Sequence, residues 1–181
     1  MPRRRFPLAG TVTAAALLLA IVVVLASATA PADAKTTSLA SSFLEPHNAA
    51  RRAVGVPALR WDERLAAYAR WYAAARAGDC RLQHSHGRDD YGENLFRGSG
   101  GAGWTPAAVV GAWVQERALY DRSTNSCRGG GGACGHYTQV VWRGTKAVGC
   151  AMAPCARAGA RFTFAVCSYS PPGNYVGMRP Y

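Results

Sequence analysis

The stretch Cys134-Gly-His-Tyr-Thr-Gln-Val-Val-Trp142 decides how this sequence is interpreted. It places His136 between a cysteine and a run of large apolar side chains. Val140, Val141 and Trp142 are residue types that a protein core accepts. We therefore expect the ring of His136 to be fixed at the edge of a core, with at least one ring nitrogen facing a cleft.

The amino terminus has the pattern of a secretory signal peptide. Three arginines at 3–5 precede the apolar run Ala14–Ala26, and Ala32-Asp33-Ala34 offers the small residues of a cleavage site. We place the signal at 1–34. An uncleaved membrane anchor is the alternative, because no charge falls between residues 5 and 33, a length that could span a bilayer. After removal of the signal we expect no stable membrane span and a secreted, extracellular protein.

The exported chain, 35–181, is long enough for one domain with its own core. The signal contains three of the 21 basic residues and one of the 10 acidic residues, so its removal leaves a formal charge of +9. We divide the chain into a flexible polar lead-in at 35–42 and a domain at 43–181. Its last segment, 171–181, has too much proline and glycine for regular structure. We expect a monomer.

A basic surface suits anionic lipid headgroups, acidic polysaccharide or nucleic acid. Nucleic acid is disfavoured, because the arginines are scattered, no basic run contains interleaved aromatic residues, and the secretory route avoids most nucleic acid. We therefore predict no nucleic-acid partner and name anionic microbial or cell-wall surfaces as candidate partners. The alternative is that these charges only keep an exported protein soluble.

An even number of cysteines behind a secretory signal predicts a disulfide framework. The six cysteines are Cys80, Cys127, Cys134, Cys150, Cys155 and Cys167. Zinc binding by cysteines is disfavoured, because the sequence contains no Cys-x-x-Cys pair. The residues alone favour only one pairing, Cys127 with Cys134, because the glycine tract between them can close on itself without strain.

Hydrophobic periodicity predicts three helices and three or four short strands, which together indicate a layered α/β or α+β domain. The predicted helices are 43–52, beginning near Leu44 or Glu45 because proline at 46 suits a first turn; 62–78, with Asp62 as N-cap; and one capped by Thr105. The predicted strands are 92–96, 147–153 and 161–169, with a long connection at 154–160. Residues 137–141 fit either a helix or a strand.

Two imidazoles and two carboxylates stand beside hydrophobic or cysteine-anchored sequence: His84, Glu93, Glu116 and His136. Glu116 lies on the apolar stripe of its helix, between Trp113 and Tyr120, and a carboxylate there needs a partner because its burial alone is costly. Such a set can hold a divalent cation such as zinc or can perform acid and base chemistry. The alternative is a buried network of polar groups that neutralise one another.

Several motifs, in this order along the chain, resemble the CAP superfamily, and within it the plant pathogenesis-related 1 proteins. They are His-Asn-Ala-Ala-Arg at 47–51, Ala-Gly-Asp-Cys at 77–80, Gly-Glu-Asn-Leu at 92–95, Gly-His-Tyr-Thr-Gln-Val-Val-Trp at 135–142, Gly-Asn-Tyr-Val-Gly at 173–177 and Arg-Pro-Tyr at 179–181. The resemblance covers essentially 43–181. It implies a three-layer α-β-α sandwich of the CAP type, with disulfides Cys80–Cys155, Cys127–Cys134 and Cys150–Cys167.

The resemblance also assigns the site. His84, Glu93, Glu116 and His136 map onto the cleft tetrad of the family, which in some relatives binds zinc or another divalent ion. It implies no required cofactor and no established enzymatic activity. One departure is the longer loop 85–92, whose Asp89 and Asp90 could displace Glu93 or add carboxylates to the cleft.

The function that the resemblance implies is a secreted, apoplastic plant defence protein that binds sterol or other lipid and restricts microbial growth. An apolar groove is then required, and Phe96 and Trp104 are candidates for its rim. The lipid-binding residues themselves stay unassigned.

Two other functions remain open. The chain resembles precursors of an eleven-residue signalling peptide, here 171–181, released by a cut between Ser170 and Pro171, although Ser168 stands where the family usually has Asn. The alternative is that this tail packs across the domain. A metal-dependent hydrolase is the third hypothesis, with Ser85 and Thr138 near the tetrad but in no nucleophile motif.

Overall fold

The protein, seen in a computed structural model, is described over residues 33–85, 90–100, 103–130 and 132–181. The predicted signal peptide lies outside these residues up to position 32. The helices are α1 (Asp33–Ala53), α2 (Glu63–Ala75), α3 (Pro106–Gln115) and α4 (Gly135–Val140), with a 3₁₀ helix η2 (Glu116–Leu119). The strands are β1 (Arg60–Trp61), β2 (Gly92–Ser99), β3 (Tyr120–Asp121), β4 (Ser126–Cys127), β5 (Ala147–Arg157) and β6 (Ala160–Ser170). Over the described part of the chain, no helix has the length and apolar character of a membrane span.

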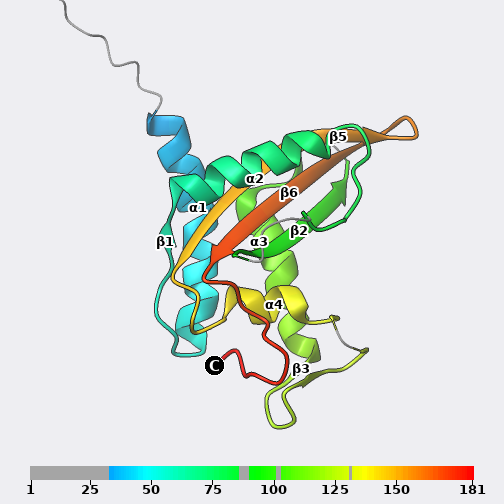
Figure 1. Cartoon of the computed structure of the whole chain (residues 1–181). Coiled ribbons are helices and arrows are strands. Elements are labelled where there is room, and N and C mark those ends of the chain that lie inside the picture. Colours follow the sequence, from blue (N-terminus) through cyan, green and yellow to red (C-terminus); the bar gives the residue numbers. More distant parts are fainter. Residues whose placement is uncertain (1–32, 86–89, 101–102, 131) are drawn as a thin grey trace, which may run out of the picture. The chain divides into compact units, whose positions relative to one another are not determined.

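The main sheet has the strand order β1-β5-β6-β2. β5 and β6 form an antiparallel hairpin, β2 pairs antiparallel with the other side of β6, and β1 runs parallel to the start of β5. β3 and β4 form a separate small antiparallel pair. The sheet therefore brings β2 and β6, which are far apart in the sequence, side by side (Figure 1).

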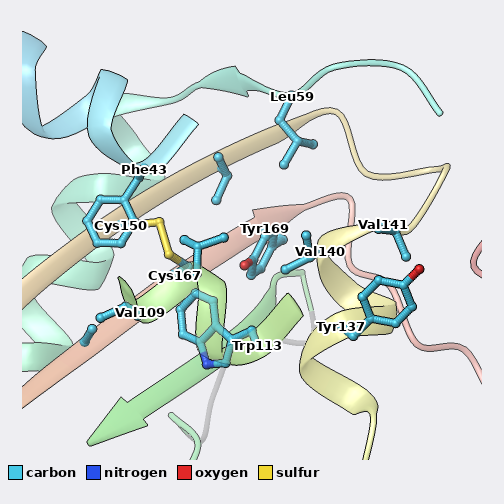
Figure 2. Close-up of a cluster of buried hydrophobic side chains, with 13 residues drawn as sticks. Phe43, Leu59, Val109, Trp113, Tyr137, Val140, Val141, Cys150, Cys167 and Tyr169 are labelled. Atoms are coloured by element: carbon cyan, nitrogen blue, oxygen red, sulfur yellow. A yellow bond between two sulfur atoms is a disulfide. The ribbon is translucent and has the colours of Figure 1, made fainter. Parts of the chain in front are cut away.

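Helices cover both faces of this sheet. α2 lies along one face, and α1, α3 and α4 lie on the other (Figure 1). The larger buried cluster is built on the second face and includes Phe43, Trp113, Val140 and Tyr169 (Figure 2). A second cluster, with Ala69, Tyr72 and Ala73 of α2, fills the space between α2 and the sheet. This is the three-layer α-β-α sandwich that the resemblance to the CAP superfamily implied.

Helix α1 begins earlier than predicted. The prediction placed its start near Leu44 or Glu45, on the argument that Pro46 belongs in a first turn. The helix instead begins at Asp33, and Pro46 lies inside it. Phe43 and His47, which are buried on either side of Pro46, attach this part of α1 to the core. Tertiary packing has therefore overridden the local preference of proline.

Helix α2 starts as predicted, because the Asp62 carboxylate accepts hydrogen bonds from the backbone N–H groups of Arg64 (2.8 Å) and Leu65 (3.1 Å). Its packing on the sheet depends on Gly149 of β5. A Cβ at this position would lie 2.1 Å from the backbone nitrogen of Ala66. Any side chain there would push α2 off the sheet.

The predicted strands of the hairpin are present and longer than expected. The connection predicted at 154–160 is only the turn at Ala158 and Gly159, both with positive φ. Pro154 stands within β5 rather than in a loop. It is tolerated because β1 pairs with β5 only at 147–148, so β5 is an edge strand at Pro154.

Arg51 connects α1 to the opposite end of the larger cluster. It is fully buried, and its guanidinium donates to the backbone oxygens of Pro57 (2.6 Å), Val140 (2.9 Å), Trp142 (2.9 Å) and Thr145 (3.0 Å). Burial lowers the pKa of Arg51 to about 10, which leaves it charged at neutral pH. The side chain thus fixes the carbonyls at the end of α4 and in the loop that follows.

All six cysteines are paired: Cys80 with Cys155, Cys127 with Cys134, and Cys150 with Cys167. These are the pairings that the resemblance implied. The second bridge closes a glycine tract, in which Gly129, Gly130 and Gly132 have positive φ. Glycine is required there because other residues rarely adopt that conformation.

Candidate functional site

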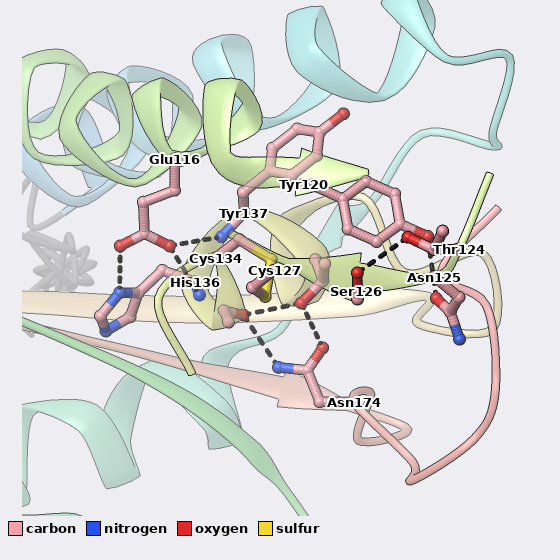
Figure 3. Close-up of a disulfide and its surroundings, with 12 residues drawn as sticks. Glu116, Tyr120, Thr124, Asn125, Ser126, Cys127, Cys134, His136, Tyr137 and Asn174 are labelled. Carbon is pink, nitrogen blue, oxygen red and sulfur yellow. Dashed lines mark hydrogen bonds and ion pairs between the residues drawn. A yellow bond between two sulfur atoms is a disulfide. The ribbon is translucent and has the colours of Figure 1, made fainter. Parts of the chain in front are cut away.

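One half of the predicted tetrad joins η2 to α4, because Glu116 is the first residue of η2 and His136 lies on α4. Residues 137–141, undecided from the sequence, are helical as far as Val140. The Glu116 carboxylate accepts hydrogen bonds from the backbone N–H groups of His136 (3.0 Å) and Tyr137 (3.2 Å), at the start of α4 (Figure 3). It also bonds the Nδ1 of His136 at 2.6 Å. Glu116 therefore caps α4 and orients His136, which supplies the partner that this carboxylate needed.

The ring of His136 is held on its other side as well. Trp113 stacks on it, with 6.1 Å between ring centroids and 20° between planes. The backbone carbonyl of His136 accepts a hydrogen bond from Asn94 Nδ2 at 3.0 Å. The His136 side chain is one-third exposed. His136 is thus a fixed imidazole at the core edge, as expected from the sequence.

The other half of the tetrad lies at the start of β2. The Glu93 side chain is only 8% exposed, and its Oε1 accepts from His84 Nδ1 (2.8 Å) and from the backbone N–H of Ser85 (3.0 Å). Its Oε2 accepts from Ser85 Oγ at 2.7 Å. The hydrogen bond to Glu93 raises the pKa of His84, whose side chain is mostly exposed. The longer loop has therefore not displaced Glu93 from His84; Asp89 lies outside the described residues.

A buried hydrogen-bond chain connects β2 with α1. Asn94 Nδ2 donates to the hydroxyl of Tyr169 (3.2 Å), which lies 2.8 Å from His47 Nε2. His47 Nδ1 lies 2.7 Å from the carbonyl of Phe43, so it carries the proton and Nε2 accepts from Tyr169. Burial lowers the pKa of His47 to about 4 and raises that of Tyr169. His47 is therefore neutral and structural, and it takes no part in the two His–Glu pairs.

The chemistry of the donor set decides whether the four residues fit a divalent cation. The structure forms two His–Glu pairs, in which each imidazole uses Nδ1 on its own carboxylate. Over the described ranges, no three His, Cys, Asp or Glu side chains gather as a ligand group. A zinc site with protein ligands ordinarily needs three or four of them. Among the described residues, the four side chains therefore form two separate pairs rather than one ligand group, and each pair leaves an imidazole Nε2.

The two hydroxyl groups that lie near the tetrad in sequence, those of Ser85 and Thr138, are not hydrogen bonded to an imidazole. Ser85 Oγ donates to the Glu93 carboxylate rather than to an imidazole. Thr138 Oγ1 hydrogen bonds to the carbonyl of Gly135 (3.1 Å) and to Asn174 Oδ1 (2.7 Å). A serine or threonine nucleophile needs its proton taken by an adjacent base, which an acidic carboxylate does poorly.

A pocket of about 240 Å³ lies beside the His84–Glu93 pair. Its polar lining residues are His84, Ser85, Glu93, Gln139, Ser168 and Asn174. Tyr68 and Tyr91 contribute its aromatic side. Helical spacing in α2 would place Tyr68 in the apolar stripe with Leu65 and Tyr72, but it is only half-buried and reaches this pocket.

An apolar groove runs between α1 and α3, on the opposite face of the sheet. It consists of two cavities, of about 280 Å³ and about 570 Å³, that share Pro46 and Ala49. Ala50, Ala53 and Gly111 line the first cavity, and Pro106 lines the second. The periodicity of the sequence did not reveal this groove, because small residues on a helix look the same whether they permit close packing or leave a gap.

The predicted rim residues lie elsewhere. Phe96 and Trp104 pack edge to face, with 4.7 Å between ring centroids, against the larger buried cluster. Trp104 also donates its indole N–H to the carbonyl of Ser99 at 2.9 Å. Neither residue lines the α1–α3 groove.

The carboxy-terminal tail, 171–181, has no helix or strand and packs across the domain. Asn174 Nδ2 donates to the carbonyl of Gly135 at 2.8 Å, so the side chain is held by α4 on both its atoms (Figure 3). The backbone N–H of Arg143 donates to the carbonyl of Pro180 at 2.7 Å. Tyr181 reaches the hydroxyl of Tyr137 at 3.1 Å.

Comparison with known proteins gives concordant matches. Residues 44–169 match the family described as CAP, the cysteine-rich secretory protein family. The chain is 52% identical over 147 residues to the pathogenesis-related protein PR-1 of Medicago truncatula, a match that covers 81% of this chain and 82% of the relative. It is 47% identical over 164 residues to the pathogenesis-related protein PRMS of Zea mays, covering 91% and 95%. Among solved structures, NaASP2 with Zn²⁺ matches with a TM-score of 0.62 at 27% identity, over 80% of this chain and 85% of that one.

Proposed function

The chain belongs to the CAP family of cysteine-rich secretory proteins and is a pathogenesis-related protein 1-like member of it, and we propose that it is exported to the apoplast and acts in defence by binding a sterol or other lipid. The groove between α1 and α3 is the observation that carries this proposal. The proposed function includes no hydrolytic step and requires no cofactor.

The dimensions of the groove support a lipid. Its lining on α1 extends from Ser42 to Ala53, about 16 Å at the helical rise of 1.5 Å per residue. Most of the lining side chains are alanine, proline and valine. A long apolar molecule that fills this groove would remove its own surface and that of the groove from water, at about 25 cal/mol per Å² of apolar area.

The groove also offers charged groups for a polar end. Glu45 and Arg52 line the second cavity, and Arg117 lines the first. A sterol hydroxyl or a fatty-acid carboxylate can hydrogen bond to such groups while its hydrocarbon part stays in the groove. Withdrawal of sterol from a microbe that depends on external supply would then restrict its growth.

A substitution at Gly111 tests the groove. Nothing lies within 4 Å of the position that a Cβ would take there, so leucine enters the groove without meeting the backbone. Leucine is also a better helix former than glycine, by roughly 0.5–1 kcal/mol. We expect Gly111→Leu to keep the thermal stability and to weaken the binding of a fluorescent sterol or fatty acid by about tenfold or more.

The matched control is Ala74→Leu, which adds a similar side chain to an exposed position of α2. It should bind the probe like the wild type. The same variants are then compared for growth inhibition of a sterol-dependent microbe, with added sterol expected to relieve inhibition. A wild-type protein that binds neither probe, or a Gly111→Leu protein that binds both with unchanged affinity, contradicts the proposal.

A further inference from the structure

The pocket beside the His84–Glu93 pair has no role in the lipid function. It is lined by residues of α2, β2, β6, α4 and the tail, and it shares no lining residue with the α1–α3 groove. Its polar and aromatic lining does not suit a hydrocarbon chain. Three observations indicate which class of ligand the pocket does suit.

The first observation is a path of aromatic rings that leads out of the pocket. Tyr91 and Tyr68, which line it, have ring centroids 5.7 Å apart, and Trp71 follows at 5.4 Å from Tyr68. The tryptophan side chain is 61% exposed. Exposure of an indole contributes nothing to the fold, whereas an exposed aromatic face next to a pocket can stack on the flat apolar side of a sugar ring.

The second observation is a buried hydroxyl without a partner. Ser168 is fully buried, lines the pocket, and lies opposite Glu93 in the β2–β6 register. Its Oγ makes no hydrogen bond within the described part of the protein. Such groups are uncommon, because leaving one unsatisfied costs free energy, and a bound hydroxyl group or a water would satisfy it.

The third observation concerns charge. The titratable side chains of the pocket, His84 and Glu93, are paired with each other at 2.8 Å, so neither is left to balance a charged ligand. Gln139 and Asn174 are planar amides, and both are held by other hydrogen bonds: Gln139 accepts from Gly173 N–H at 3.0 Å, and Asn174 is held by α4. Fixed amides and aromatic rings, with no unpaired charge among the lining residues that the structure describes, are typical of recognition of neutral hydroxyl-rich molecules.

We propose that this pocket and Trp71 together form a binding site for a neutral β-linked oligosaccharide. One sugar ring occupies the pocket against Tyr68 and Tyr91, with its hydroxyls toward the amides and Ser168. The next ring stacks on Trp71. β-Linked rings suit this site, because their equatorial substituents leave both faces flat and apolar. The site goes beyond the lipid function and would hold the protein on a cell-wall glycan.

The test is calorimetric titration of the full mature protein with cellohexaose, laminarihexaose and chitohexaose at millimolar concentrations. We expect at least one of them to bind. Trp71→Ala should weaken its binding by about tenfold, because a stacking contact is lost. Ser168→Ala should weaken it by about fivefold and leave the melting temperature unchanged or raised, because no hydrogen bond within the protein is removed.

Two control variants separate sugar binding at this site from binding elsewhere on the surface. Leu82→Ala removes an exposed apolar side chain (55% exposed) that is not aromatic and should bind like the wild type. Gly111→Leu, which blocks the lipid groove, should also bind the sugar normally, so the two proposals fail independently. No binding of any oligosaccharide, unchanged affinity in both Trp71→Ala and Ser168→Ala, or salt-sensitive binding of oligogalacturonide alone overturns the proposal.

Discussion

His47 is a neutral histidine inside the core, and it makes the fold sensitive to acid. Its pKa is about 4 in the folded protein and about 6.5 in the unfolded chain. Between these values the unfolded chain binds a proton that the folded protein does not. The free energy of unfolding should therefore fall as pH decreases from about 6.5 to about 4, by at most about 3 kcal/mol, and His47 contributes no further change below that.

The measurement is urea unfolding at several pH values for the wild type and His47→Gln. The variant should lack this part of the pH dependence. His84 acts in the opposite direction: its raised pKa gives a stabilisation that is present at acid pH and is lost as pH rises through its folded-state pKa. Because His84 is present in both the wild type and His47→Gln, its contribution cancels when their free energies of unfolding are subtracted. Parallel pH profiles for both proteins would rule out His47 as the cause.

Arg51 should be the arginine that the fold tolerates losing least. Lysine carries its donors on one atom and cannot reach the four carbonyls that the guanidinium contacts. Arg51→Lys should lower the free energy of unfolding by about 2–4 kcal/mol, because buried carbonyls lose their partners. Arg52→Lys, at the exposed neighbouring position, is the control and should change it by less than about 0.5 kcal/mol. Equal effects at the two positions would contradict this role of Arg51.

Among the elements, the tail and the end of β6 determine whether the last eleven residues can be released. Ser170 is paired with Ala147 in the sheet, and its carbonyl accepts from Lys146 N–H at 2.9 Å. A protease needs an extended segment free of such pairing. The native protein should therefore resist cleavage at Ser170–Pro171, and release of the peptide requires local opening of this end of the sheet.

Asn174→Ala should make that opening easier, because it removes both side-chain bonds to α4. Limited proteolysis with mass spectrometry should then show fragments from 171–181 several-fold faster than in the wild type. Tyr175→Ala removes an exposed neighbouring side chain (51% exposed) and should behave like the wild type. Equally fast release from all three proteins would show that the tail is not restrained.

The elements also differ in how far the sequence could predict them. Caps that depend on adjacent residues, at Asp62 and Thr105, could be predicted. The passage of α1 through Pro46 could not, because the helix there is held by the packing of Phe43 and His47 rather than by local propensity. The role of Glu116 as a cap of α4 was also hidden, because it depends on two backbone N–H groups twenty and twenty-one residues further along the chain.

For the protein taken together, the sandwich and the disulfides followed from motifs, whereas the surfaces did not. The four predicted site residues are present as two His–Glu pairs. The groove that supports the lipid proposal arises from the relative placement of α1 and α3, and the ring path through Trp71 arises because Tyr91, just before β2, lies beside α2. A periodicity argument assigns Tyr68 to the core, but only the packed structure shows that its ring faces a pocket.

The bridge between Cys127 and Cys134 has a practical consequence. Its Cα atoms are 5.6 Å apart, and no atom lies within 4 Å of a Cβ built at Gly130 or Gly132. A foreign peptide inserted into this tract would have both of its ends held by the same disulfide. The entropic cost of closing the loop grows only slowly with the length of the insert. The protein is therefore a ready display scaffold, in which an epitope or a reporter can be carried without rebuilding the domain beneath it.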